Sequence, residues 1–455
     1  MTAVPLAGGA VLLLLASSVT IGADTMWFVA MGDWIARHRG LPTGIPFAAA
    51  DSSGWPNVPV LGELAFAGLH ALGPLGLPAA QLVVDAVVLA VLAVDARRLG
   101  AGQRATAAVL VVAAAGALPA LGIVRAQLLS LVPFALLALL LRAEHRTPSR
   151  RVWLVPVLVA AWGNVHGAVL VGVALAGCHL LLSRLRREPG VAVAVGLATL
   201  AALWLNPAGL RTGAYYVGAL GNEAARRRSE LWASPDLGQP FDLLLVAAAL
   251  LLLGLAVAAR GPLWEQVALA GLAVATTTSA RHGVWLVLLA APPAAAGWSA
   301  LRRGRAGRHG SFGPGRPVRA PSRRRAAAVT VVLALLTAGL LLSRRDAFSS
   351  SDPVVSTVHR VAGSRVVLAP EPLAESLAVA GVTLWMSNPI DAFSPADQAA
   401  YLDFVSGSGP SARRAIDAAR VVVARSGSPP RALLSERDFV VVARVEGYDV
   451  LERRP

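Results

Sequence analysis

The sequence contains no lysine and one cysteine, and few of its residues carry a charge of either sign. All 41 basic residues are arginines, and charged residues make up 15% of the 455. With 56% hydrophobic residues and a mean hydropathy of +0.62, the chain has more apolar surface than a water-soluble globule can bury. The composition therefore excludes a wholly water-soluble protein and indicates a polytopic helical membrane protein.

The single cysteine and the N-terminal segment contain no secretory signature. Cys178 lies inside an apolar segment and has no partner in the chain, so an internal disulfide is excluded and a packing role is expected. The apolar run from Leu6 to Ile21 has no basic region before it and no small-residue cleavage site before Asp24. We expect this run to be retained as the first membrane helix.

The basic residues follow the pattern of a membrane topology signal. The net charge is +15, yet the arginines lie mostly at the ends of apolar segments and form no continuous basic face. We therefore expect membrane lipids and no nucleic acid as partners. The Ala-, Gly- and Arg-rich composition indicates a GC-rich bacterial genome, so the expected location is the bacterial plasma membrane.

Apolar segments of membrane-helix character recur along the first three quarters of the chain. Arginine clusters occupy alternate loops, and the positive-inside rule places these loops in the cytoplasm. The N-terminus is then cytoplasmic, the C-terminal part is extracytoplasmic, and about eleven transmembrane helices are predicted. The segments are 4–23, 75–95, 105–123, 127–141, 152–165, 167–183, 190–205, 241–259, 262–280, 283–300 and 326–343.

The segment 152–183 is predicted to be a helical hairpin rather than one helix. One long helix would carry an arginine cluster to the wrong side of the membrane. Two arms of about 14–16 residues measure roughly 21–24 Å, less than the hydrocarbon core of about 30 Å. The apex, Trp162 to Gly167 (WGNVHG), is therefore expected below the outer surface, beside protein or a water-filled cavity.

Two further regions differ in composition from the apolar segments. The stretch 302–325 is rich in Arg, Gly and Pro and is predicted to be a flexible cytoplasmic linker. Residues 344–455 alternate β-like runs, such as Arg420–Ala424, with helical patterns, such as Pro395–Val405. The sequence thus predicts an all-α membrane domain over 1–343 and a small C-terminal extracytoplasmic α/β domain over 344–455. It contains no GxGxxG, Walker A or HExxH motif.

Most polar residues at membrane depth map to one side of this topology. Polar groups inside a membrane are costly and therefore suggest function, whereas the cytoplasmic loops offer mostly arginine. Arg125, Arg281 and His282 could donate to a phosphate, and Asp24 could act as a general base. The residues on this side are Asp24, Arg125, Gln127, Asn164, His166, Asn206, Glu230, Arg281 and His282.

Several short motifs in this order resemble those of the GT-C superfamily of membrane glycosyltransferases, which use polyprenyl-phosphate-linked sugars. The superfamily includes protein O-mannosyltransferases and aminoarabinose transferases, and the motifs are most similar to those of uncharacterised bacterial members. The motifs are Asp24 after the first helix, Gly32-Asp33-Trp34-Ile35, Arg125-Ala126-Gln127, Trp162 to Gly167, Asn206 to Gly209 and Glu230 to Pro235.

The resemblance implies a catalytic role for Asp24, as base for the acceptor hydroxyl or as a ligand of a divalent cation such as Mg or Mn. It also implies inversion at the anomeric carbon, with polyprenyl phosphate leaving. Many active members have a second acid directly after the first, and here Thr25 holds that position. Asp33 and Glu63 are the nearest alternative acids, Asp33 as a second catalytic group and Glu63 at the substrate.

The resemblance assigns the polar residues to a donor, a polyprenyl-phosphate sugar lipid, and to an acceptor. Arg125, Arg281 and His282 would hold the donor phosphate. The sugar or acceptor would be lined by Gln127, Asn164, His166, Asn206 and Glu230.

Two other functions are compatible with the sequence. A non-catalytic glycolipid-binding or scaffold protein would explain the missing second acid. A lipid or solute transporter would need polar groups at mid-depth, for which Asp85 is the main candidate.

Overall fold

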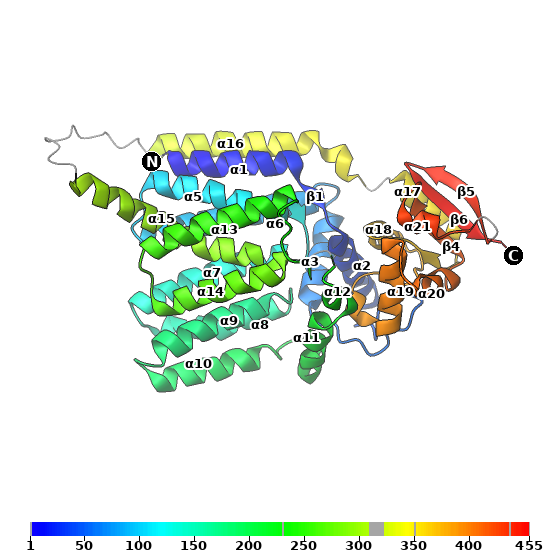
Figure 1. Ribbon diagram of the computed structural model, residues 1–455, viewed down its shortest axis with the longest axis horizontal. Coiled ribbons are helices and arrows are strands. Elements are labelled where there is room, and N and C mark those ends of the chain that lie inside the picture. The colour runs from blue at the N-terminus through cyan, green and yellow to red at the C-terminus, as the bar shows by residue number, and fades with distance from the viewer. Residues whose placement is uncertain (1, 230–231, 309–322, 350–351, 436–437, 455) are drawn as a thin grey trace. The chain divides into compact units, whose positions relative to one another are not determined.

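The fold is described from a computed structural model, which places residues 2–229, 232–308, 323–349, 352–435 and 438–454 (Figure 1). The chain divides into two compact units. The first, called here the helical unit, contains residues 1–20, 78–205 and 231–345. The second, called the α/β unit, contains residues 21–77, 206–230 and 346–455. The α/β unit is thus assembled from three separate stretches of the chain rather than from 344–455 alone.

The helical unit is a stack of apolar helices, and each of the eleven predicted apolar segments forms helix. Helices α5, α13 and α15 pack against one another, α1 lies between α5 and α16, and α14 joins α15 to α9. The bounds are α1 (Ala3–Ser18), α4 (Gly76–Arg98), α5 (Gln103–Gly116), α6 (Leu118–Gly122), α7 (Leu128–Arg146), α8 (Leu154–Gly163), α9 (Val169–His179), α10 (Pro189–Ala202), α13 (Pro240–Ala258), α14 (Leu263–Thr278), α15 (Gly283–Arg308) and α16 (Arg323–Ser343).

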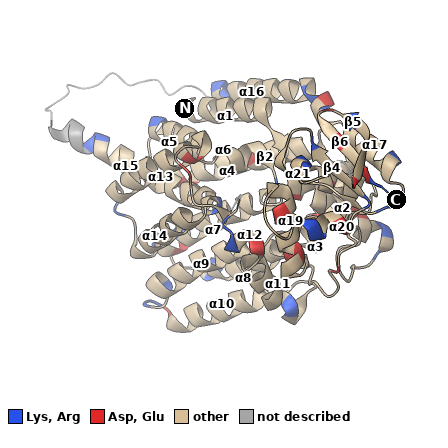
Figure 2. Cartoon of the chain, turned by 45° about the vertical axis from the view of Figure 1, so that its right-hand side comes forward, with Lys and Arg blue, Asp and Glu red and all other residues tan. Residues whose placement is uncertain are grey.

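Among the described residues, five helices are long and apolar enough to cross a membrane by length and composition. They begin at residues 76, 128, 240, 280 and 324, and several of the other apolar helices are shorter. Side chains such as Leu250, Val257 and Leu335 are exposed, as expected of surfaces that face lipid tails. Figure 2 shows arginines at helix ends and long uncharged stretches between them. These features are those of a multi-pass membrane protein.

The predicted hairpin in 152–183 is present as two packed helices, α8 and α9, joined by a turn. The α9 helix continues as a π-helical turn, η2 (Leu180–Arg184). Trp162 is 1% exposed, and its ring lies so close to Gly172 of α9 that any side chain at position 172 would overlap it. Gly172 therefore lets the two arms approach each other.

The helix ends away from the hairpin apex carry buried acids beside their arginines. Arg142 donates through Nε to Glu265 at 2.6 Å and also pairs with Asp95, and all three side chains are buried. Arg184 pairs with Glu144 at 3.1 Å. Buried arginines at these ends are thus neutralised by carboxylates, as burial requires.

The α/β unit contains a four-stranded mixed sheet with strand order β3-β4-β6-β5. The strands are β3 (Val367–Leu368), β4 (Val421–Arg425), β5 (Phe439–Val445) and β6 (Tyr448–Arg453). The β3–β4 pair is parallel and the other two pairs are antiparallel, so the predicted small α/β fold is confirmed as a mixed sheet. The predicted helix over Pro395–Val405 is α19 (Pro395–Ser406).

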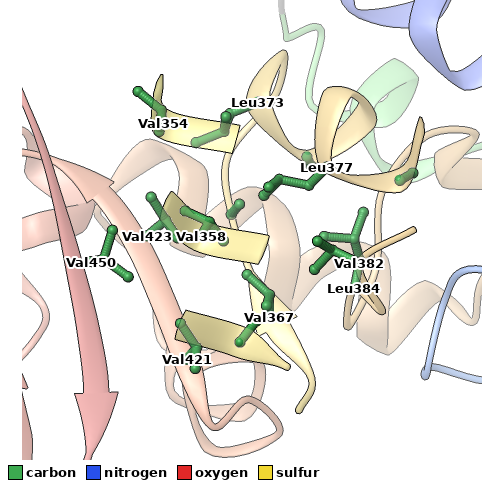
Figure 3. Close-up of a cluster of buried hydrophobic side chains, with 14 of the residues drawn as sticks. Val354, Val358, Val367, Leu373, Leu377, Val382, Leu384, Val421, Val423 and Val450 are labelled. Carbon is green, nitrogen blue, oxygen red and sulfur yellow. The ribbon is translucent and has the colours of Figure 1, made fainter. Parts of the chain in front are cut away.

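The first loop of the chain is built into this unit. It contains α2 (Ala23–His38) and α3 (Val60–Ala71), and the backbone around Ala48 pairs in parallel with Leu384, which in turn bridges to Val367. Ala30 of α2 lies in the same core as Val358 and Leu377, from α17 (Pro353–Ala362) and α18 (Leu373–Val379) (Figure 3). The region that begins with Asp24 and the C-terminal region therefore share one core.

Residues 206–230 also belong to the α/β unit. They contain α11 (Thr212–Leu220) and α12 (Glu223–Arg226). The backbone N–H of Glu223 donates to the Gln398 side chain at 2.8 Å, and Arg227 pairs with Asp403 at 2.6 Å. Charged and amide groups therefore attach this segment to α19.

Candidate functional site

The hairpin apex of the helical unit is organised by a chain of three hydrogen-bonding side chains. Trp162 Nε1 donates to Ser130 Oγ at 2.7 Å, and Ser130 Oγ lies 2.8 Å from His166 Nδ1. The backbone N–H of Ala168 also points to His166 Nδ1, at 3.2 Å. Nδ1 is therefore the acceptor, which places the ring proton on Nε2. His166 can then donate one hydrogen bond from Nε2 to a ligand oxygen.

Asn164 ties the apex to a neighbouring helix end. Its Nδ2 donates to the carbonyls of Ala160 at 2.8 Å and Leu205 at 2.6 Å. Both amide protons thus satisfy carbonyl groups at helix ends, which otherwise lack partners. Asn164 has a bracing role here, and only its Oδ1 is left for other contacts.

Arg281 connects a second motif to the apex. It lies in η5 (Ala280–His282), and its guanidinium is stacked over the Trp232 ring at 4.2 Å. The backbone N–H of Ala280 donates to the Ala233 carbonyl at 2.9 Å, which fixes the two segments together. The positive charge of Arg281 also acts on the His166 ring. The structure therefore brings Arg281, His166 and Trp232 to one end of the helical unit, with His282 beside Arg281 in the chain.

Arg125 and Gln127 lie in the turn between β2 (Ile123–Val124) and α7, and both are half-buried. Gln127 is the residue directly before α7, whose first turn carries Ser130. The turn is therefore at the same helix end as the Ser130–His166 contact. Predicted Glu230 lies outside the described residues.

Asp85 is the main candidate for the mid-depth polar group that a transporter would need. It is buried within α4, and its Oδ1 accepts from Gln81 Nε2 at 3.0 Å, one helical turn away. This hydrogen bond satisfies one oxygen of the carboxyl group, and by itself it gives no evidence for transport.

Asp24 lies in the first turn of α2, where the helix dipole favours a negative charge. Asp33 is nine residues further along the same helix, which is about 13.5 Å along the axis and on the opposite face. The helix therefore does not bring Asp33 to Asp24. Thr25 is completely buried. Gly32 of the same motif has a packing role, because any side chain there would overlap the backbone of Glu63.

Glu63 is a buried acid held by an amide. Asn57 Nδ2 donates to Glu63 Oε2 at 2.7 Å, while Glu63 Oε1 has no hydrogen-bond partner within the described residues. Burial raises the pKa of Glu63 to about 8, against the opposing effect of the Asn57 hydrogen bond. Glu63 is therefore protonated at neutral pH.

Asn206 makes hydrogen bonds within its own turn. Its Nδ2 donates to Thr212 Oγ1 at 2.9 Å, and its Oδ1 accepts from the N–H of Ala208 at 2.9 Å. This geometry is an Asx turn, in which an asparagine side chain caps the next residues. The Asn206 motif thus has a local structural explanation.

A group of acids that the sequence did not predict lies in the C-terminal part of the α/β unit. Asn388 Nδ2 donates to Glu371 Oε2 at 2.7 Å and to Glu375 Oε1 at 3.0 Å. Burial raises the pKa of Glu375 to about 7, and the charge of Asp24 adds to this rise. Asp24 and Glu375 are thus close enough to interact, because α18 packs against α2.

A second missed contact links the first loop to the C-terminal region. Trp55 Nε1 donates to Asp391 Oδ2 at 3.0 Å, and burial raises the pKa of Asp391. Trp55 also lies beside Trp27 and Tyr215, with ring centroids 6.1 Å apart in both pairs. This unit therefore contains a cluster of aromatic rings with a carboxylate beside it.

One sequence signal could have identified Glu375. It occurs in a short helix whose other core-facing residues include Ala374 and Leu377, so an acid at that position is unexpected. For Asp391 no such local signal exists, since its partner Trp55 is 336 residues away.

The acids near Asp24 are candidate ligands for a metal ion. Among the described residues, no group of three or more His, Cys, Asp or Glu side chains is arranged to hold a metal ion. The described residues around Asp24 therefore do not by themselves fit a protein-bound divalent cation.

Comparisons with known proteins identify the fold. No family model matches the sequence, and neither does any curated protein. The structure is similar to the crystal structure of ArnT from Cupriavidus metallidurans bound to undecaprenyl phosphate, with a TM-score of 0.55 and 16% identity over 98% of this chain and 97% of ArnT. It is also similar to the archaeal oligosaccharyltransferase AglB from Archaeoglobus fulgidus in complex with an inhibitory peptide and a dolichol-phosphate. That TM-score is 0.50, with 12% identity over 92% of this chain and 69% of AglB. Over nearly its full length, the chain therefore shares a fold with ArnT and AglB, which are both GT-C membrane glycosyltransferases.

Proposed function

We propose that the protein is a membrane glycosyltransferase that moves a sugar from a polyprenyl-phosphate donor to an acceptor on the extracytoplasmic side of a bacterial plasma membrane. The observation that carries this proposal is the similarity over 98% of the chain to ArnT, whose structure contains undecaprenyl phosphate. The acid at the start of α2 and the arginines at the helix ends supply the group types that such a reaction needs.

In the proposed reaction, Asp24 acts as the general base. It takes the proton of the acceptor hydroxyl while that oxygen forms a bond to the anomeric carbon of the sugar. The bond from the anomeric carbon to the phosphate oxygen breaks at the same time, and polyprenyl phosphate leaves with the electron pair. A direct displacement of this kind inverts the anomeric centre. Asp33, on the opposite face of α2, has no part in this step.

Positive and neutral donors at the helix ends would bind the leaving phosphate. Arg281 presents a guanidinium whose face is stacked on Trp232, and a guanidinium is a group that can contact phosphate oxygens in a bidentate way. His166 would add one N–H from Nε2, and Arg125 and His282 would contribute further donors. Charge-assisted hydrogen bonds of this type stabilise the negative charge that develops on the leaving group.

The remaining predicted residues have supporting roles in this proposal. Glu63 is protonated at neutral pH and could donate a hydrogen bond to a sugar hydroxyl, while Gln127 lies beside Arg125 in the α7 turn. Asn164 and Asn206 shape the backbone around their turns. Glu230 is retained as a substrate-binding prediction from its motif.

The direct test is transfer by the purified protein in lipid nanodiscs. Radiolabelled hexosyl and pentosyl undecaprenyl phosphates are offered with a membrane extract as acceptor source, and release of undecaprenyl phosphate is measured. We expect turnover with at least one donor. Loss of Arg281 in Arg281→Gln should raise the KM for that donor about 10- to 100-fold, the effect of about 1.5–3 kcal/mol for a hydrogen bond to a charged group. Turnover with an unchanged KM would contradict the phosphate-binding role.

A second candidate function is glycolipid binding without catalysis. It is favoured by Thr25, which stands where many active members of the superfamily have a second acid and which is buried. In that case the protein would bind undecaprenyl phosphate, and Arg281→Gln would weaken binding, but no donor would be turned over.

A further inference from the structure

The helical unit has an apolar groove between α9 and its π-helical continuation η2 on one side and α10 on the other. Its volume is about 330 Å³, and its lining includes Val173 and Leu181 on the first side and Val193, Leu197 and Leu200 on the second. Leu181, Val193 and Leu197 are each more than half exposed, so the groove opens onto the surface. The helix α10 lies at the edge of the stack and packs on α8 more than on α9 (Figure 1). The groove therefore faces the surroundings of an apolar helix bundle, which are lipid tails.

Small residues keep the groove open and apolar. A Cβ atom at Gly177 would meet no atom within 4 Å, and one at Gly196 would meet only the Leu180 side chain at 3.9 Å. The hydroxyl of Thr199, which also lines the groove, donates to the Val195 carbonyl at 2.7 Å within its own helix. The lining residues therefore offer mainly hydrocarbon contacts, which suit an alkyl chain better than a sugar.

The length of the groove is close to that of one half of a bilayer. Its lining on the first side runs from Val173 to Leu185, which are 12 positions apart. This separation is about 18 Å on a helix, and half of a hydrocarbon core measures about 15 Å. The polar turn between η2 and α10 follows Leu185 directly. A lipid chain in the groove would therefore have its headgroup at the Leu185 end.

The Leu185 end of the groove is rich in exposed arginines. Arg186 and Arg187 follow Leu185 in the chain, and both are exposed. The end of α7 lies beside them, because Arg187 donates to the His145 carbonyl at 2.9 Å. The segment that joins α7 to α8 adds three more exposed arginines, Arg146, Arg150 and Arg151.

The acids at this end are paired with a different arginine. Arg184, the last residue of η2, is buried, and it pairs with Glu144 at 3.1 Å and with Glu188 at 3.0 Å. None of the five exposed arginines forms a salt bridge with a residue that the structure describes. The two carboxylates are thus held by a guanidinium inside the protein. An excess of positive charge therefore remains on the surface at the Leu185 end.

We propose that the groove binds one anionic phospholipid, with an acyl chain along α9 and α10 and the phosphate at Arg186 and Arg187. A basic cluster beside a gap between membrane helices is suited to an anionic headgroup. The charge favours this occupant over a second copy of the chain, because two copies joined here with parallel helices would bring like charges together. The proposal does not depend on sugar transfer. The donor phosphate of the proposed reaction is placed at the His166 end of α9, whereas this phosphate lies at the other end.

The role of charge is tested by native mass spectrometry of the purified protein with phosphatidylglycerol or phosphatidylcholine of the same acyl chains. We expect one phosphatidylglycerol to bind about 10-fold more tightly than phosphatidylcholine. Combining Arg186→Gln with Arg187→Gln should weaken phosphatidylglycerol about 10- to 30-fold and leave phosphatidylcholine unchanged. Equal binding of the two lipids by the wild type, or unchanged binding by the double variant, would overturn the proposal.

The matched control removes two other exposed arginines of the helical unit. Arg98 ends α4, and Arg104 lies in the first turn of α5. Arg98→Gln combined with Arg104→Gln makes the same change in net charge and should bind phosphatidylglycerol like the wild type. An equal loss of binding in this control would show general attraction to the whole protein and would contradict a site at the groove.

The groove itself is tested by filling it with a side chain. Gly177→Leu puts a side chain into open space and replaces a glycine within a helix, so the protein should fold. A phosphatidylglycerol with a photoreactive acyl chain should label residues 173–200 of the wild type and label them about 10-fold less in Gly177→Leu. If that variant does not fold, Gly196→Leu fills the groove from the other side. Gly254→Leu, at an exposed and open position of α13, is the control and should be labelled like the wild type. Unchanged labelling in a folded groove-filling variant would overturn the proposal.

Two other occupants give distinct results in the same experiments. If undecaprenyl phosphate displaces the photoreactive lipid at a lower concentration than phosphatidylglycerol does, the groove belongs to the sugar donor. If the wild type is a dimer that Gly177→Leu converts to a monomer, the groove belongs to a second copy of the chain. Either result would contradict the proposal. Each measurement is made without sugar transfer, so a failure of the proposed reaction leaves this test intact.

Discussion

Two sites with buried carboxyl groups, one in each unit, hold these groups in different ways. In the helical unit, Asp95 and Glu265 share the guanidinium of Arg142, which also donates to the Leu289 carbonyl at 2.7 Å. In the α/β unit, Glu63 and Glu375 are held by the amides of Asn57 and Asn388. An arginine supplies a fixed positive charge, whereas an asparagine supplies only a neutral donor.

This difference separates structural acids from acids that can change their protonation state. A guanidinium is always charged, so it supplies a counter-charge to its carboxylate partners and contributes to packing of the bundle. An amide leaves burial as the dominant influence, and the pKa values of Glu63 and Glu375 rise to about 8 and about 7. We therefore place the proposed proton chemistry among the acids of the α/β unit.

The largest loss of stability is expected when the Arg142 guanidinium of the helical unit is removed. Arg142→Ala leaves Asp95 and Glu265 buried without a counter-charge, which should cost about 3–5 kcal/mol. We expect loss of folded protein, measured by monodisperse yield and thermal unfolding in detergent. The combination Arg142→Met, Asp95→Asn and Glu265→Gln removes all three charges and should recover most of the yield. If Arg142→Ala alone is as stable as the wild type, the arginine-held acids are not structural.

A smaller, pH-dependent effect is expected at Glu63. Its folded-state pKa is raised from 4.5 to about 8, so the stability it contributes is full below pH 4.5 and is lost as the pH rises through 8. Glu63→Gln keeps an acceptor for Asn57 and should be more stable than the wild type by a few kcal/mol at pH 8, but not at pH 4.5. Thermal unfolding at both pH values measures the difference. Parallel melting curves at every pH would show that Glu63 is not a buried neutral acid.

The smallest loss of stability is expected for a substitution of Arg184. It shows whether the arginines of the helical unit differ in how strongly their carboxylate partners depend on them. The Glu144 carboxylate pairs with Arg184 at 3.1 Å and also accepts a hydrogen bond from the backbone N–H of Ser149 at 2.8 Å. Because a second donor remains, Arg184→Gln should cost only about 1–3 kcal/mol. The same unfolding assay used for Arg142 measures it. A loss as large as that of Arg142→Ala would mean that serine and backbone donors cannot replace the cation.

The elements of this fold were accessible from sequence because they depend on local patterns. All eleven apolar segments form helix, since unbroken apolar runs can satisfy their backbone only in that way inside a membrane. The hairpin in 152–183 followed from the arginine clusters on both sides of it. The runs at Arg420–Ala424 and Phe439–Val445 form the strands β4 and β5, because β-branched residues favour strands.

The assembly of the α/β unit was not accessible from sequence. Pairing of the backbone near Ala48 with Leu384 joins segments more than 300 residues apart, and no local pattern encodes it. The same long-range packing brings Glu375 to Asp24. Conversely, Asn206 and Gly32 stood out as motif residues, and the structure gives both a local packing or turn explanation. The role of Asp24 stays a prediction, and sequence reasoning did not predict Glu375, a buried acid on the helix that packs against α2.

The central claim is that Asp24 is the base of a sugar transfer from a polyprenyl-phosphate donor. The most direct measurement is the single-turnover rate of sugar release from such a donor by Asp24→Asn, with Glu446→Gln as the matched control. Loss of a general base should lower the rate about 10²- to 10⁴-fold while donor binding is retained, and the control should react like the wild type. An Asp24→Asn protein that is folded, binds the donor and releases sugar at the wild-type rate would contradict the account.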